Sequence, residues 1–147
     1  MTELPEPVQF YLAACDRISD QGIRAGIESL SPVERVVFRA YIFDCDEQNG
    51  SMSQFFYNTD SSPEIAEDTA RSLDAIGTPK TAAVLRSAAA VVCRADAHTF
   101  VGTWGSYLAQ VDPARHLDLC MEQMRDTGES VCGALETFII NHRHELE

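Results

Sequence analysis

Apolar residues recur every three or four positions along most of the chain, the spacing that places them on one face of an α-helix. Apolar positions from Val8 to Ile18 follow this spacing and predict an amphipathic helix over residues 5–19, opened by two prolines. The polar sequence Ser-Asp-Gln-Gly at residues 19–22 predicts the end of that helix. A second, short helix is expected over residues 23–30.

The clearest helix start lies at residues 31–34, Ser-Pro-Val-Glu. It combines a serine at the N-cap, a proline at the first helical position and a glutamate at the third. Apolar positions continue from Val36 to Phe43, and the acidic stretch 44–47 marks the end of the helix. Asn49-Gly50 is expected to supply the left-handed residue with which many helices end.

Residues 49–58, Asn-Gly-Ser-Met-Ser-Gln-Phe-Phe-Tyr-Asn, place three consecutive aromatic residues between side-chain amides. Phe55 and Phe56 are expected to point into the core of a corner between helices, because adjacent phenyl rings are costly to leave in water. The alternative is that Tyr57 and the amides line a groove for a small ligand or peptide. In the first interpretation the amides satisfy backbone groups at helix ends, and they belong to Asn49, Gln54 and Asn58.

Residues 60–63, Asp-Ser-Ser-Pro, end one helix and begin the next, with Ser61 and Glu64 at the spacing of a capping box. That helix is expected to close at Gly77, and Pro79 then opens an alanine-rich helix suited to close contact with its neighbours.

The segment 96–113 has two glycines within an aromatic stretch and is expected to be irregular with some helix. Apolar spacing predicts a helix from residue 114 to about residue 125, and another from Val131 to about His144. Gly128 is expected to separate or kink these two helices.

No stretch alternates apolar and polar residues as a strand would, and no internal repeat is present. The fold class expected is all-α, a single-domain bundle of about six or seven helices. The domain is expected to span residues 1–145. Leu146-Glu147 resembles the junction that cloning vectors leave before a purification tag, so these two residues are left out of functional reasoning.

Charge and cysteine content narrow the functional classes. The chain has 23 acids and 11 bases, a net charge of -12, which disfavours direct nucleic-acid binding and favours basic partners. The alternative is that this charge only keeps the protein soluble.

No apolar stretch is long enough to cross a membrane, and the first residues are acidic, so a cytoplasmic location is expected. The five cysteines include no C-x-x-C pair and are expected to be reduced core residues: Cys15, Cys45, Cys93, Cys120 and Cys132.

The order of these motifs resembles the DNA-mimic-protein C-terminal-like domain, a bacterial family. The resemblance covers Leu30 to Val92 and rests most specifically on Asn49-Gly50, Gln54-Phe55-Phe56 and Asn58, joined to the sequence Leu73-x-x-Ile76-Gly77. It implies an all-helical fold. It also implies a function, since the named member of the family is an acidic dimer that imitates DNA by its charge and occupies a transcription factor. It supplies no catalytic residues.

Two sets of acids are candidates for a DNA-like surface. Asp118, Glu122, Asp126 and Glu129 fall along one possible helix face, although Arg115 and Arg125 stand near enough to neutralise part of it. The second set flanks the aromatic run and has no base within it, so it is the preferred partner-binding face: Asp44, Asp46, Glu47, Asp60, Glu64, Glu67 and Asp68.

No known catalytic or metal-binding motif is present. His142 and His144 stand two apart on a helix and cannot chelate one metal ion, and there is no nucleophile elbow, H-E-x-x-H sequence or phosphate-binding glycine loop. We therefore expect no enzyme activity, metal or cofactor.

The sequence favours a non-enzymatic protein whose acidic face binds a basic protein, such as a transcription regulator, in competition with nucleic acid. Two alternatives stay open. One is a ligand-binding or catalytic helical domain with a pocket near Gln54, Tyr57 and Trp104. The other is a module whose role is homodimerisation.

Overall fold

The computed structural model describes residues 2–147, and these form eight α-helices and two short 3-10 helices without a strand. The all-α prediction is confirmed, and the expected six or seven helices correspond to the longer ones, since the last helix is a single turn. In chain order the elements are α1 (Glu6–Ala25), η1 (Ile27–Ser29), α2 (Pro32–Asn58), α3 (Pro63–Ala75), α4 (Pro79–Val92), η2 (Ala97–Thr99), α5 (Trp104–Val111), α6 (His116–Arg125), α7 (Val131–Asn141) and α8 (Arg143–Leu146).

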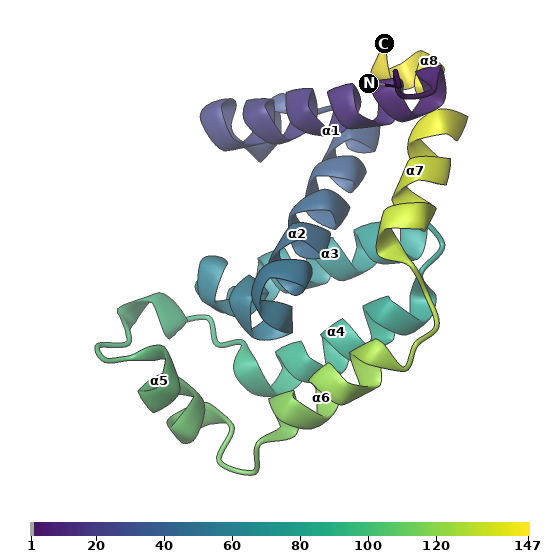
Figure 1. Cartoon of the computed structure of the whole chain (residues 1–147). Coiled ribbons are helices and arrows are strands. Elements are labelled where there is room, and N and C mark those ends of the chain that lie inside the picture. The colour runs from purple at the N-terminus through teal and green to yellow at the C-terminus, as the bar shows by residue number, and fades with distance from the viewer. Residues whose placement is uncertain (1) are drawn as a thin grey trace.

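Helix α4 lies between α3 and α6, and α1 crosses the far end of α2 (Figure 1). The long α2 connects these two parts, since it packs on α1 at one end and on α3 at the other, while α7 returns beside it. Leu146 of α8 is buried near the start of the chain, where its carbonyl oxygen accepts a hydrogen bond from Arg17. The aromatic corner in the second half of α2 therefore lies at the end of α2 remote from α1, where Ser51 contacts Met121 of α6 (Figure 1).

Helix α1 runs past the end predicted for it at residues 19–22. Gly22 does not stop the helix because it serves as a contact point, where a Cβ atom would come within 2.4 Å of the Phe38 ring on α2. The helix ends at Gly26, whose φ of 85° suits glycine, and the helix expected over residues 23–30 is reduced to η1.

Helix α2 begins as predicted, with a complete capping box between Ser31 and Glu34. Its end was predicted too early. The chain kinks at Gly50 and Ser51 and then continues as a helix to Asn58. The left-handed residue of the kink is Ser51, with a φ of 64°, and not Asn49 or Gly50. Because the chain kinks at this point and the helix does not end, the aromatic run forms the last part of α2.

The predicted burial of the paired phenylalanines is confirmed. Phe55 and Phe56 are fully buried, and their rings meet edge to face at 5.5 Å. Phe43, from the turns before the kink, packs against Phe55 at 5.2 Å in the same manner. Edge-to-face pairs add about 0.5–1.5 kcal/mol to the burial of the rings. The kinked corner is therefore held by an aromatic cluster in the core.

Helix α3 starts one residue later than predicted, because Ser62 and not Ser61 is the N-cap and accepts a hydrogen bond from the Ile65 amide. Its inner face is as expected, with Thr69 and Leu73 fully buried. Gly77 follows the helix with a φ of 91°, and Pro79 opens α4, as predicted.

The segment 96–113 holds η2 and α5, in agreement with the expected mixture of irregular chain and helix. Tyr107 of α5 fixes this segment to the bundle, because its hydroxyl donates a hydrogen bond to the Val92 carbonyl at the end of α4. Gly128, with a φ of 71°, separates α6 from α7.

The five cysteines are all free. Cys15 and Cys93 are buried, and burial raises the pKa of each thiol to about 12. Cys132 is exposed, which contradicts its expected place in the core. Among the described residues, no helix combines the length and apolar character needed to cross a membrane.

Candidate acidic interface

Ion pairs within the chain engage most of its bases. Eight arginines pair with aspartate or glutamate: Arg17, Arg24, Arg35, Arg39, Arg71, Arg86, Arg115 and Arg143. Since the acids outnumber the bases by 23 to 11, most acids of the described chain have no base at ion-pairing distance. The location of those unpaired acids decides where a basic partner is attracted.

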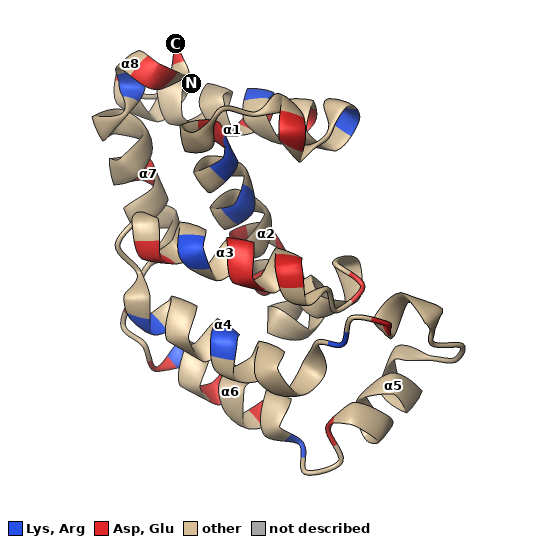
Figure 2. Cartoon of the chain, turned by 180° about the vertical axis from the view of Figure 1, so that it is seen from behind, with Lys and Arg blue, Asp and Glu red and all other residues tan. Residues whose placement is uncertain are grey.

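On α3, two of the seven predicted acids are neutralised by arginines. Asp68 accepts hydrogen bonds from Arg39 at 2.7 Å and Arg35 at 3.0 Å. Burial alone would raise the pKa of Asp68, but these two arginines outweigh it and the pKa is lowered. Glu67 pairs with Arg86 of α4, so that acidic and basic segments face each other across α3 and α4 (Figure 2). The sequence missed the pairs across helices because Arg35, Arg39 and Arg86 come from α2 and α4. Arg71 also pairs with Glu67, at 3.8 Å, and its place four residues later on α3 is a signal that the sequence does contain.

The family motif holds one acid in place through its amides. Gln54 donates a hydrogen bond to the Asn58 side chain, and Asn58 donates in turn to Asp46, each at 2.9 Å. Burial raises the pKa of Asp46, and the Asn58 hydrogen bond opposes that rise. The predicted capping role is therefore wrong for Gln54 and Asn58, which bond to side chains, and the bond from Asn58 to Asp46 crosses the kink. Asn49 makes no side-chain hydrogen bond to residues 2–147 and is exposed.

Asp44 and Glu47 lie on the other side of α2, in a cavity of about 390 Å³ that Arg125 and Glu129 also line. Burial raises the pKa of both carboxyls, and the charge of Asp44 adds to the rise at Glu47. Gln48 donates a hydrogen bond to Asp44 at 2.9 Å, which partly offsets the burial of that carboxylate.

Asp60 and Glu64 are exposed acids without an ion pair in the described chain. Asp60 occupies a left-handed conformation with a φ of 53°, followed by Ser61 with a φ of 49°. This turn carries the chain from α2 to α3, and the Ser62 hydroxyl donates a hydrogen bond to Glu64. The seven acids therefore lie at separate places around the kinked corner, five of them without a paired base.

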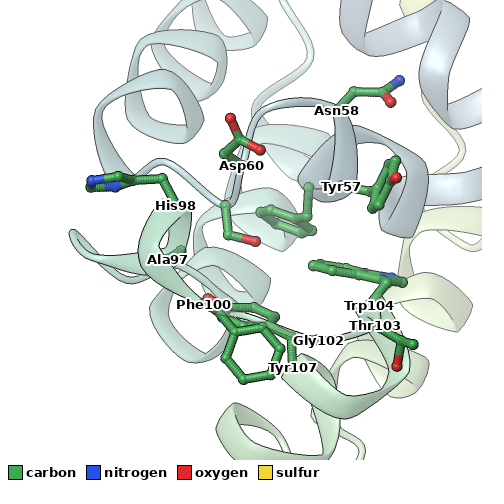
Figure 3. Close-up of a pocket in the computed structure, with 12 residues that line it drawn as sticks. Tyr57, Asn58, Asp60, Ala97, His98, Phe100, Gly102, Thr103, Trp104 and Tyr107 are labelled. Carbon is green, nitrogen blue, oxygen red and sulfur yellow. The ribbon is translucent and has the colours of Figure 1, made fainter.

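An aromatic cavity of about 380 Å³ opens beside Asp60 (Figure 3). Tyr57 from the end of α2 meets Trp104 of α5 edge to face at 6.0 Å, and Trp104 stacks on Tyr107 at 5.4 Å. The Trp104 ring nitrogen donates a hydrogen bond to Ser53 at 2.8 Å, which ties α5 to the kinked corner. The pocket predicted near Tyr57 and Trp104 is thus present, but Gln54 does not line it.

The acidic stripe predicted from residue 118 to residue 129 is wrong, because α6 ends before Asp126. Glu129 instead accepts hydrogen bonds from the Lys80 and Thr81 amides at the start of α4, where a carboxylate is favoured. The predicted neutralisation by Arg115 is confirmed by its ion pair with Asp118. Asp112 caps α6 through the amides of residues 116 and 117, a role the sequence analysis missed although an aspartate before a helix is a usual cap.

Histidines contribute no cluster to the site. His142 shares a hydrogen bond with the Phe138 carbonyl oxygen at 2.8 Å, and His116 contacts the Ser87 hydroxyl at 3.2 Å. Over residues 2–147, no group of three or more histidine, cysteine, aspartate or glutamate side chains is arranged to hold a metal ion.

Comparison with known proteins agrees with the resemblance drawn from the aromatic run. The family model described as DMP19-like protein, where the abbreviation stands for DNA mimic protein 19, matches residues 28–142. Neither a curated protein nor a solved structure matches the chain. The matched region extends from η1 to the end of α7 and so includes the kinked corner, the acids around it and the aromatic cavity. The chain therefore belongs to the DMP19-like family.

Proposed function

We propose that the protein is a non-enzymatic, cytoplasmic interaction protein that binds a basic DNA-binding protein in place of DNA. The proposal rests on the negative charge that remains once the ion pairs within the chain are taken into account. Eight of the 11 bases are engaged by acids of the same chain, while five acids around the kinked corner have no base at ion-pairing distance. Membership of a family named for DNA mimicry supports the same function.

The partner-binding face proposed here extends around both sides of the kinked corner and consists of its five unpaired acids: Asp44, Asp46, Glu47, Asp60 and Glu64. Glu67 and Asp68 have smaller roles, because their arginine partners already satisfy their charge. A carboxylate that must be extracted from an internal ion pair gains less from a new basic partner than one that is free.

Rigidity supports this choice of face. Asp46 is held by the Asn58 amide, and the buried Phe55 and Phe56 fix the chain that leads to Asp60. DNA presents its phosphates at a fixed spacing, so carboxylates on a rigid corner imitate it at a lower entropic cost than carboxylates on a mobile loop.

The test replaces two free acids of the face without changing the fold. The double variant Glu47→Gln, Glu64→Gln is compared with Glu122→Gln, Asp126→Asn, which removes the same charge from two unpaired acids at the C-terminal end of α6. Basic proteins captured from a native lysate at low salt are identified, purified and titrated with each variant. The first variant is expected to bind roughly tenfold more weakly than wild type, a loss of about 1–2 kcal/mol.

The α6 variant is expected to keep most of the affinity. Equal losses of affinity in both variants would show that only net charge matters. Unchanged affinity in both variants would contradict the proposed face. Capture that is unchanged at high salt would contradict an electrostatic interface altogether.

A further inference from the structure

We infer that the aromatic cavity beside Asp60 is an anchoring site for an arginine side chain of the protein partner. This inference rests on the proposed function, because it takes the partner to be a basic protein. It adds a recognition element of a different kind, since a surface of carboxylates alone attracts any cation whereas a cavity selects one by shape.

The cavity offers aromatic faces to a ligand. Its volume of about 380 Å³ lies within the range of about 300–1,000 Å³ usual for ligand sites. Tyr57, 58% exposed, forms one wall with Trp104, and Phe100 packs edge to face against Tyr107 at 5.4 Å (Figure 3). A guanidinium group is planar and weakly hydrated, and it stacks on such rings more readily than an ammonium group does.

The polar groups at the cavity favour a cationic donor. Asp60 is exposed and its carboxylate makes neither a hydrogen bond nor an ion pair with residues 2–147. Ser61, only 1% exposed, also lines the cavity, and its hydroxyl lies beside Tyr107 without reaching hydrogen-bonding geometry. The Tyr107 hydroxyl is already used, because it donates to the Val92 carbonyl. A ligand with several N–H donors would therefore find a free carboxylate there, while the unpartnered Ser61 hydroxyl is buried in the cavity wall.

No lysine or arginine lines the cavity, so an anion has no basic group to bind. His98 does line it, but Figure 3 shows its ring pointing away from the aromatic walls. The cavity next to Asp44 and Glu47 is a weaker candidate for a guanidinium group, since its only aromatic residue, Phe43, is buried and offers no ring face. Charge and exposed aromatic faces together thus select the cavity beside Asp60.

Direct measurement is possible because Trp104 is the only tryptophan of the chain. The full chain is titrated at low salt with a short blocked peptide containing one arginine, and Trp104 fluorescence is recorded. The controls are the same peptide with citrulline, which is a neutral analogue of arginine, and with lysine. A saturable change with a Kd of roughly 1 mM is expected for the arginine peptide, given the small size of the anchored group.

Asp60→Asn is the informative variant, because asparagine tolerates the left-handed conformation of this residue and removes only the charge. It is expected to weaken binding of the arginine peptide about fivefold. Glu122→Gln removes an equal charge from α6 and is expected to leave binding unchanged. For the citrulline peptide and wild type, we expect a Kd at least as high as the Kd of the arginine peptide and Asp60→Asn.

Equal binding of the arginine and citrulline peptides would overturn the inference, as would equal losses in Asp60→Asn and Glu122→Gln. So would the absence of a saturable change. Because the proposed function is tested with Glu47 and Glu64, which do not line this cavity, the two can fail separately. If the arginine peptide does not bind but the basic protein partner does, the anchoring site alone is overturned. If the peptide binds but no basic protein partner does, the proposed function alone is overturned.

Discussion

Individual carboxylates near the kink are held in positions that do not favour their charge. Asp44, Asp46 and Glu47 are partly buried without an ion pair, and burial raises the pKa of each. A protein selected only for stability would place arginines beside them, as it does for Asp68. Unpaired acids that lower stability are typical of functional sites, where a ligand supplies the missing partner.

This strain is measurable at Asp44. A carboxyl whose folded pKa lies above its unfolded value destabilises the protein at neutral pH, and the penalty disappears as the pH falls below the unfolded value. Asp44→Asn is therefore expected to raise the Tm at pH 7 and to change it little near pH 3, because asparagine can still accept the Gln48 hydrogen bond.

Thermal unfolding of Asp44→Asn at several pH values checks this, with Asp16→Asn, an exposed and unpaired acid of α1, as control. A lower Tm at pH 7 for Asp44→Asn would mean that the charge itself stabilises the fold, which the account excludes.

At the scale of elements, the contact between α1 and α2 depends on a glycine that the sequence analysis took for a helix stop. Gly22 lies inside α1, and the Phe38 ring occupies the space where a Cβ would be. Helix propensity alone would favour alanine at position 22 by about 1 kcal/mol, so the two effects oppose each other.

Gly22→Ala therefore separates packing from propensity. We expect a net loss of stability of about 1–3 kcal/mol, because a Cβ at 2.4 Å from an aromatic ring forces α1 away from α2. Chemical denaturation measures the loss, and Gly133→Ala in α7, where the nearest contact is 3.2 Å to the Ser130 hydroxyl, is the matched control. A stabilised Gly22→Ala would show that α1 can move without cost.

Local signals in the sequence predicted most helices, because caps, prolines and apolar spacing act within a few residues. The capping box of Ser31 and the separation at Gly128 are examples. Gly22 and the kink at Ser51 were misread, since a glycine at a helix crossing and one at a helix end look alike in sequence. The pairs of Asp68 with Arg39 and of Glu67 with Arg86 could not be predicted, because they depend on how distant helices pack.

On the scale of the whole molecule, the kinked corner brings two of the unpaired acids, Asp46 and Asp60, close to the aromatic cavity. Asp46 and the cavity share Asn58, which bonds to the first and lines the second. The amides that marked the family in the sequence thus join the two candidate recognition elements. Homodimerisation stays a prediction.

A competition experiment tests whether this protein takes the place of DNA on a basic partner. A partner captured at low salt and purified is bound to labelled DNA, and the protein is added while fluorescence anisotropy follows release of the DNA. We expect complete displacement, with an affinity for the partner that falls at least about tenfold between 50 and 200 mM salt. A complex in which the partner holds DNA and this protein together, or displacement that is insensitive to salt, would contradict the proposed function.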